Sequence, residues 1–258
     1  MTAVIRFIPN AITLLNAFSG ALAVLYIANG KLLVGAYFIA LGAFFDFFDG
    51  LAARALKVNS PVGKDLDSLA DMITFGLAPA FLAHKLLLIS LGEFAEEFDP
   101  WLYLQYIPFI AVMFTAFRLA KFNHDDRQSH CFYGLASPAH ALFWISIPLS
   151  IHYSDQNWLL SWLYERFQYD MTVLFFQPQI IIALSIFLSV LMVLDLPLFA
   201  LKFEGFSWKG NELKISFLII SLLLLATIGF VAVPLILLLY VLMSLLHYKV
   251  FSRGVVKQ

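Results

Sequence analysis

Four aspartates in two closely spaced pairs are the residues of this chain whose types and spacing could do chemistry. Asp46 and Asp49 are three residues apart, and Asp67 and Asp71 are four residues apart. On a helix both spacings place the two carboxylates on one face. Carboxylate oxygens suit a hard divalent cation such as Mg²⁺ or Mn²⁺, and no nearby Cys or His pattern is typical of a zinc site. The spacing therefore predicts a metal site built from all four aspartates.

The residues that follow the first pair could bind phosphate. Gly50 lets another backbone or a phosphate approach closely, and Ala53 is also small. Arg54 lies one helical turn after Gly50, where its guanidinium can form two parallel hydrogen bonds with phosphate oxygens. Metal ligands, an arginine and an open glycine together favour phosphoryl transfer. A single Asp or Arg near a helix end is commonly an interfacial residue, but that explanation does not suit the whole spaced set.

The elements that must position these residues are membrane helices. Of the 258 residues, 62% are hydrophobic and 13% are charged, whereas soluble domains have roughly 45–50% and about 25%. A transmembrane helix needs about 20 apolar residues. We therefore expect an all-α integral membrane protein, a polytopic bundle of about eight helices with a six-helix core and a C-terminal hairpin. The predicted spans are 8–29, 32–56, 66–91, 101–121, 136–152, 173–195, 214–230 and 232–249.

One membrane domain, 1–258, accounts for the chain, with a catalytic core over about 8–200 and a hairpin over about 213–250. The hairpin comes from an apolar run that is too long for one crossing, and Gly229 and Pro234 offer the break. A six-span alternative merges or drops this final pair. The apolar stretch at the N-terminus is too long for a cleavable signal peptide. The longest loops are predicted at 122–135, 153–172 and 196–213.

The distribution of positive charge predicts the orientation. If the N-terminus is cytoplasmic and eight spans alternate, thirteen of the 16 Lys and Arg residues fall on the cytoplasmic side. The other side then holds Lys31, Lys85 and Arg166. This positive-inside bias predicts a multi-pass protein of the cell membrane with both termini in the cytoplasm. The aspartate pairs then open to the cytoplasm.

Together the pairs form the pattern D-x2-D-G-x2-A-R-x8-G-x3-D-x3-D, which resembles the signature of the CDP-alcohol phosphatidyltransferases. The chain matches every fixed position from Asp46 to Asp71, Gly63 included. The resemblance implies a helical membrane fold, commonly a homodimer, with its site at the cytoplasmic interface. It implies that an alcohol displaces CMP from CDP-diacylglycerol or a related CDP-alcohol. It also implies that CDP-diacylglycerol is bound by Gly50, Ala53, Arg54 and Gly63.

Three other segments resemble bacterial and archaeal phosphatidylserine synthases, which implies L-serine as the accepting alcohol. Residues 117–123 are similar to F-R-L-A-R-F-N, with Lys121 where arginine is usual, and residues 134–139 are similar to G-L-P-S/I-P-A, with Ala136 in place of the usual proline. Serine carries a carboxylate, which needs a cation, and Arg118 and Lys121 share one helix face. The serine-binding candidates are Arg118, Lys121, Asn123 and Ser137.

The third segment, residues 8–16, is similar to a P-N-x2-T-x2-N opening. Asn10, Thr13 and Asn16 recur every three residues on an apolar helix. This polar stripe could hydrogen-bond a neighbouring helix or line the nucleotide pocket. The resemblance favours the pocket for Asn10 and Thr13. We expect His140, inside an apolar span, to be a buried and satisfied histidine.

The hypothesis is an in-line displacement in which the aspartates hold two Mg²⁺ or Mn²⁺ ions on the pyrophosphate and Asp71 is the base for the serine hydroxyl. The partners are CDP-diacylglycerol, L-serine and membrane lipid, with no nucleic acid. One alternative is the same chemistry on glycerol 3-phosphate, inositol or inositol phosphate, and another is a covalent phosphatidyl-enzyme route. A remote alternative is a cation-coupled transporter, against which the chain has no inverted repeats.

Overall fold

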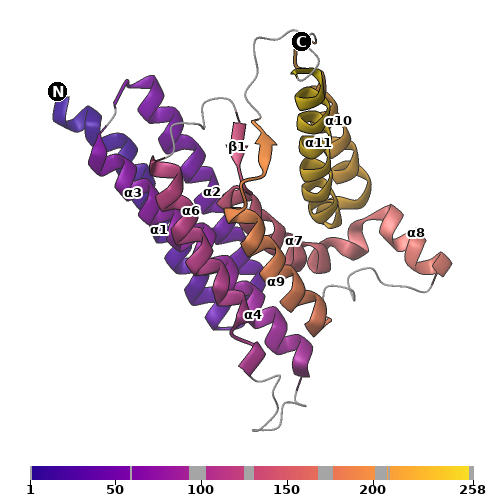
Figure 1. Ribbon diagram of the computed structural model, residues 1–258. Helices are drawn as coiled ribbons and strands as arrows, with labels where there is room; N and C mark the ends of the chain where they lie inside the picture. The colour runs from indigo at the N-terminus through magenta and orange to yellow at the C-terminus, as the bar shows by residue number, and fades with distance from the viewer. Residues whose placement is uncertain are drawn as a thin grey trace.

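The computed structural model consists almost entirely of helices and describes residues 2–58, 60–92, 103–124, 131–167, 177–200, 208 and 210–255. Most of the helices run side by side in one bundle, and a helical hairpin stands beside it near the C-terminus (Figure 1). The predicted all-α architecture is confirmed, apart from one short pair of strands.

The first two helices form an antiparallel pair. A short turn in which Gly30 has a φ of +77° joins α1 (Thr2–Ala28) to α2 (Leu32–Ala55). Glycine adopts positive φ without the steric cost that a Cβ brings. Next to this turn Gly35 lies against the Ile27 side chain, which a Cβ at residue 35 would overlap. The small residue therefore lets the two helices pack closely.

The third long helical segment is continuous and contains a π-helical turn. Its parts are α3 (Pro61–Asp71), η1 (Met72–Leu77) and α4 (Ala78–Leu91). Ser60 caps the N-terminus by accepting a hydrogen bond from the Gly63 backbone N–H at 2.9 Å. Proline is favourable at the first helical position. This helical segment therefore begins at Pro61, earlier than the apolar span predicted from residue 66, and Gly63 lies in its first turn.

Three more helices complete the six-helix core: α6 (Ile110–His124), α7 (Ser137–Tyr153) and α9 (Pro178–Val193). A 3₁₀ turn, η3 (Ile107–Phe109), precedes α6, so this helix begins later than the span predicted from residue 101. Side chains of α4 and α7 form much of the buried core, in which Trp144 is among the largest fully buried side chains.

The C-terminal hairpin consists of α10 (Glu212–Ile228), the 3₁₀ turn η6 (Gly229–Val231) and α11 (Ala232–Val255). The predicted break at Gly229 is present, and this residue has a φ of +59°. The hairpin is the least buried of the four long apolar segments named below. Exposed leucines such as Leu222 and Leu246 cover it, which is the surface expected of helices in lipid.

Four elements lie inside stretches that the sequence predicted as loops. Two strands, β1 (Cys131–Tyr133) and β2 (Pro197–Phe199), pair antiparallel with Cys131 opposite Phe199. A 3₁₀ turn, η4 (Ser154–Gln156), and α8 (Trp158–Phe167) follow α7. Short strands and short helices contain too few residues to show a clear periodic pattern, so these four elements were not predicted from the sequence.

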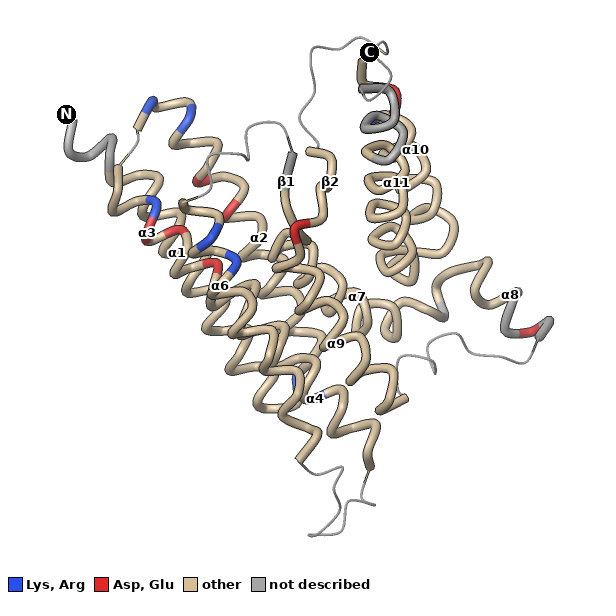
Figure 2. Tube along the Cα trace, viewed as in Figure 1, with Lys and Arg blue, Asp and Glu red and all other residues tan. Residues whose placement is uncertain are grey.

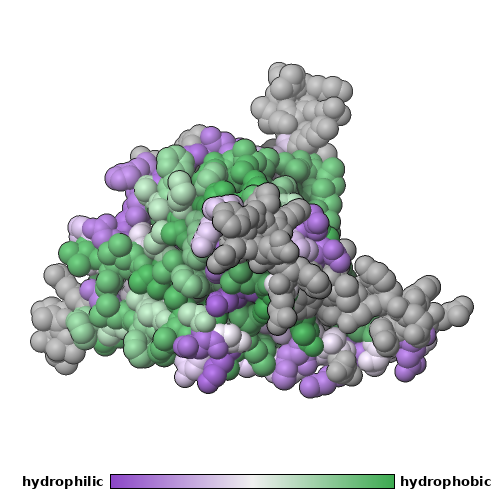
Figure 3. All heavy atoms as spheres, turned by 90° about the horizontal axis from the view of Figure 1, so that it is seen from below, coloured by the Kyte–Doolittle hydropathy of each residue, from purple (hydrophilic) through white to green (hydrophobic). Residues whose placement is uncertain are grey.

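The protein is a multi-pass membrane protein. Within the described residues four helical segments are long and apolar enough to cross a bilayer: Phe7–Ala28, Leu32–Ala55, Pro61–Leu91 and Glu212–Tyr248, the last of which contains both hairpin helices. Charged residues gather at one end of the bundle, around the end of α2, α3 and the end of α6 (Figure 2). Hydrophobic side chains dominate the face in Figure 3, with polar ones toward its margins.

Candidate active site

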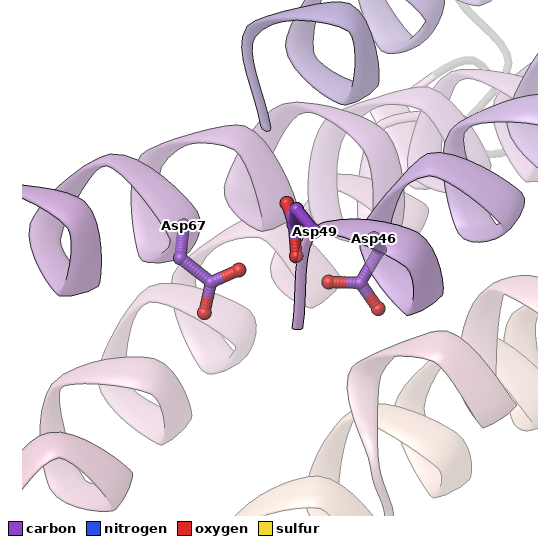
Figure 4. A group of neighbouring side chains, drawn as sticks. All are labelled: Asp46, Asp49 and Asp67. Atoms are coloured by element: carbon purple, nitrogen blue, oxygen red, sulfur yellow. The ribbon is translucent and has the colours of Figure 1, made fainter. Parts of the chain in front are cut away.

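Three of the four predicted metal ligands meet where α2 ends and α3 begins. Asp46 and Asp49 lie on α2 and Asp67 on α3, and one carboxylate oxygen from each lies within 4.8 Å of the others. Figure 4 shows the Asp46 and Asp67 carboxylates directed toward one another, with Asp49 between them. Asp49 is buried, and its Oδ2 has no hydrogen-bond partner among the described residues. An unpartnered carboxylate oxygen among two other carboxylates is unfavourable without a cation.

The connection between α2 and α3 brings the two pairs to the same depth. After α2 ends, the Leu56 and Val58 backbone N–H groups donate to the carbonyls of Ala52 and Ala53. Lys57 has a φ of 52°, in the left-handed region, which reverses the chain within a few residues. This short connection brings Asp46 and Asp49 of α2 close to Asp67 of α3.

Asp71 lies beside this cluster but outside the three-carboxylate set. Its carboxylate adjoins that of Asp46 and accepts a hydrogen bond from Asn16 Nδ2 at 3.3 Å. Asn16 is fully buried, and its Oδ1 has no partner among the described residues. The polar stripe on α1 therefore reaches the candidate base through Asn16, a residue of the stripe that was not among the predicted site residues.

The π-helical turn η1 begins directly after Asp71 and is held from several sides. The Thr74 hydroxyl donates to the Asn16 carbonyl at 3.0 Å. Gly20 and Gly42 lie so close to Thr74 that a Cβ at either position would overlap it.

His140 Nδ1 is 3.4 Å from the Phe75 carbonyl, and Trp144 Nε1 donates to His140 Nε2 at 3.1 Å. His140 is thus buried and hydrogen-bonded, as predicted. Single π-turns are frequent at functional sites, and this one begins at the residue after Asp71.

A cavity of about 210 Å³ opens beside the carboxylates. Five residues predicted to bind CDP-diacylglycerol line it, together with Asp49 and Asp67: Asn10, Thr13, Gly50, Ala53 and Gly63. A Cβ at Gly63 would lie 2.9 Å from Ser60 Oγ and 3.1 Å from Asn10 Oδ1, so a larger residue would narrow the cavity. The residues of α1, α2 and α3 that were predicted to bind CDP-diacylglycerol therefore line a single cavity.

Two polar residues of the cavity lining were not predicted, and one predicted residue lies outside the lining. Ser60 and Lys64 also line the cavity. Ser60 before Pro61 is a readable helix-start signal, whereas nothing in the pattern singles out Lys64. Arg54, predicted to bind phosphate, is exposed on the last turn of α2 outside the cavity lining, and its Nε donates to the Gly50 carbonyl at 3.1 Å.

Arg118 and Ser137, predicted to bind serine, are in direct contact. Arg118 Nη1 donates to Ser137 Oγ at 2.8 Å, and Ser137 is the first residue of α7. The guanidinium lies within electrostatic reach of Asp71. Its Nε has no hydrogen-bond partner among the described residues. The arginine therefore retains donor capacity for an anionic group between α6 and the candidate base.

The other two serine-binding candidates contact protein groups. Lys121 Nζ forms an ion pair with Asp195 Oδ1 at 2.6 Å, which joins α6 to the end of α9. Asn123 Nδ2 donates to Ser68 Oγ at 2.8 Å, and the Asn123 carbonyl accepts from Lys64 Nζ at 2.7 Å. These contacts join α6 to the helix that carries Asp67 and Asp71. Of these candidates, Arg118 has a buried donor, Nε, that has no hydrogen-bond partner among the described residues.

The arrangement as a whole can bind a polyphosphate and activate a hydroxyl. Clustered carboxylates can hold hard cations, the adjoining cavity can take a nucleotide, and Asp71 is a carboxylate oriented by an amide. Arg118 can pair with an anionic group on the attacking molecule.

Comparison with known proteins agrees with this chemistry. The family model described as CDP-alcohol phosphatidyltransferase matches residues 6–191. A CDP-diacylglycerol–serine O-phosphatidyltransferase of Bacillus subtilis is 34% identical over 140 residues, which are 52% of this chain and 70% of the relative. Enzymes with the same name from Helicobacter pylori and Saccharomyces cerevisiae are 29% and 37% identical over 136 and 119 residues. The aligned parts are 52% and 43% of this chain, and they span 54% and 39% of these two relatives.

Proposed function

Because this chain belongs to the CDP-alcohol phosphatidyltransferase family, we propose that it transfers the phosphatidyl group of CDP-diacylglycerol to the hydroxyl of L-serine. The products are phosphatidylserine and CMP. The observation that carries the choice of serine is Arg118, a cation held by Ser137 near Asp71, with donor capacity left for a carboxylate. The names of the relatives support the same acceptor.

Mg²⁺ or Mn²⁺, as two ions, is the proposed cofactor, and the donor set fits it. Asp46, Asp49 and Asp67 offer three oxygens close together, and Asp71 adjoins Asp46. When bound, such ions supply positive charge that stabilises the pyrophosphate and the departing phosphate. The unpartnered Asp49 Oδ2 is the observation that supports this assignment.

The cavity between α1, α2 and α3 is the proposed site for the CDP moiety. Asn10 and Thr13 offer polar groups to the nucleotide, and Gly50 and Gly63 leave room for its phosphates. Lys64 adds positive charge at the cavity wall. Arg54, at the rim, is proposed to reach the phosphates from outside the lining. The acyl chains remain in lipid, which is why the site must lie at the end of a membrane bundle.

In the proposed reaction the serine hydroxyl attacks the phosphorus that bears diacylglycerol. The bond from serine oxygen to phosphorus forms, and the bond from that phosphorus to the CMP oxygen breaks. Asp71, oriented by Asn16, accepts the hydroxyl proton, while Arg118 holds the serine carboxylate. The buried His140 bonds to the Phe75 carbonyl and to Trp144 and does not pair with a hydroxyl or thiol there, so we propose direct displacement.

We propose further that the site faces the cytoplasm, as the positive-inside bias predicts, and that the protein is a homodimer in the cell membrane. A thiol-labelling experiment on single-cysteine variants at Asn29 and Lys57, in a Cys131→Ser background, tests the orientation. In intact cells, a membrane-impermeant thiol reagent is expected to label Asn29→Cys and to leave Lys57→Cys unlabelled. Protection of Asn29→Cys alone would reverse the assignment.

The test of the proposed function is CMP release by the purified protein from CDP-diacylglycerol. Serine, glycerol 3-phosphate and inositol are offered separately, with Mg²⁺, with Mn²⁺ and with a chelator. We expect release with serine and metal only, and phosphatidylserine as the lipid product. Faster CMP release with another alcohol would mean that this alcohol, and not serine, is the acceptor. Exchange of labelled CMP into CDP-diacylglycerol without any acceptor would favour the covalent phosphatidyl-enzyme route.

A further inference from the structure

The C-terminal hairpin is joined to the core through the backbone of β2. The Tyr240 hydroxyl donates to the Phe199 carbonyl at 2.9 Å, and the Phe199 N–H donates to Ser244 Oγ at 3.3 Å. Both backbone groups of one strand residue are therefore bonded by side chains of α11. Phe199 and Ser244 are buried, so these bonds are shielded from competing water.

Aromatic rings reinforce the same junction. The Tyr240 and Phe199 ring centroids are 4.9 Å apart, and those of Phe199 and Phe217 are 5.6 Å apart, both in edge-to-face geometry. The Phe217 and Tyr240 rings are also in contact, with centroids 5.7 Å apart. We call Phe199, Phe217 and Tyr240 the aromatic clasp. It draws one residue from β2, one from α10 and one from α11, and such ring pairs fix relative orientation as well as burying area.

From the clasp, hydrogen bonds and short stretches of backbone connect the hairpin to Arg118. β2 pairs with β1, and the sheet continues as the Gly134 N–H donates to the Leu196 carbonyl at 2.9 Å. Three residues later Ser137 begins α7 and accepts the hydrogen bond from Arg118. The hairpin is thus connected, through β2, β1 and Ser137, to Arg118, the residue that we propose binds the carboxylate of the acceptor.

We propose that the C-terminal hairpin is a positioning element for the acceptor alcohol, and that Tyr240 is its principal positioning residue. This inference rests on the proposed function, because it takes Arg118 as the acceptor-binding group. An arginine side chain has many rotamers, and fixing it before the ligand binds reduces the ordering cost of binding. The hairpin lies outside residues 6–191, the part of the chain that the family model matches.

The test is Tyr240→Phe, which keeps the ring of the clasp and removes the hydrogen bond to Phe199. We expect the KM for serine to rise about fivefold, as for the loss of one neutral hydrogen bond, with the KM for CDP-diacylglycerol unchanged. Tyr37→Phe is the matched control. It removes a hydroxyl contact of 2.6 Å with Tyr153, at the opposite end of α7 from Ser137, and should leave both constants unchanged.

A double variant separates positioning from general stability. If Tyr240 acts through the guanidinium, Tyr240→Phe should add little to the effect of Arg118→Lys on the serine KM. Independent, additive effects would overturn the inference. Equal rises in the two substrate constants, or a lower melting temperature with unchanged constants, would also overturn it and make the hairpin a structural element only.

Two provisions keep the result decisive. Ser244→Ala, which removes the other bond to Phe199, replaces Tyr240→Phe if that variant does not fold. The acceptor KM is measured with whichever alcohol the wild-type protein uses. If this alcohol is not serine, the proposed function fails, while the selective rise in acceptor KM still decides the inference.

Discussion

The donor region and the acceptor region of this protein are built in different ways. The proposed donor region, Asp46–Asp71 with the cavity beside it, comes from three helices that follow one another in the chain, α1, α2 and α3. The acceptor region combines Arg118 of α6 and Ser137 of α7 with the sheet and with Tyr240 of α11. The proposed phosphoryl chemistry therefore relies on residues from consecutive helices, whereas the proposed recognition of the attacking alcohol depends on packing between segments that are distant in the sequence.

The two regions should also respond differently to mutation. The donor region concentrates negative charge, so the loss of one carboxylate changes cation binding or proton transfer directly. The acceptor region depends on one arginine and on neutral hydrogen bonds that orient it. Its variants should affect the acceptor constant by smaller factors and should leave the lipid constant unchanged.

The largest effect is expected for Asp71→Asn. The amide keeps the shape but cannot accept the hydroxyl proton, so kcat for CMP release should fall by about 100-fold or more. Binding of CDP-diacylglycerol, measured by calorimetry in detergent, should persist. Asp65→Asn, the same change at an exposed position of α3 outside the cluster, should behave like the wild type. Wild-type turnover in Asp71→Asn would remove this residue from the base role.

The next effect is expected for Asp67→Asn, which removes one of the three clustered carboxylates. The concentration of Mg²⁺ or Mn²⁺ that gives half-maximal activity should rise about tenfold or more, since even an indirect partner of a metal ligand has an effect of that size. Titration of CMP release with each cation measures it, again with Asp65→Asn as the control. An unchanged metal requirement would mean that the cluster does not hold the cofactor.

A smaller and more selective effect is expected for Arg118→Lys. Lysine keeps the charge but loses the planar fork and the geometry toward Ser137, so the KM for serine should rise by about tenfold. The matched variant is Arg54→Lys in the donor region, which should raise the KM for CDP-diacylglycerol instead. If both variants changed the same constant, the division into two regions would be wrong.

The smallest effect is expected for Lys121→Met. Lys121 forms a partly exposed ion pair with Asp195, and such pairs contribute only about 0.2–1 kcal/mol. The serine KM should therefore change by less than about threefold. A rise as large as that of Arg118→Lys would show that Lys121 leaves Asp195 to bind the acceptor, as predicted from the resemblance of residues 117–123 to F-R-L-A-R-F-N.

Much of the fold was predictable because long apolar runs have few alternatives to membrane helices. The break at Gly229 was readable from a run too long for one crossing, and eight helical segments lie near the eight predicted spans within the described residues. The strands β1 and β2 were not readable, because each is three residues long and its partner lies about 65 residues away. The role of Asn16 was hidden for a similar reason, since its partner Asp71 is on another helix.

The sequence alone determined the membrane class and the donor chemistry. Those properties depend on apolar length and on residues one helical turn apart, which the helix itself brings together. The tertiary structure was needed to show that Asp71 accepts a hydrogen bond from Asn16, that Lys121 pairs with Asp195, and that the last hairpin is hydrogen-bonded to β2. These contacts join residues from separate segments, and their positions depend on how the whole bundle packs.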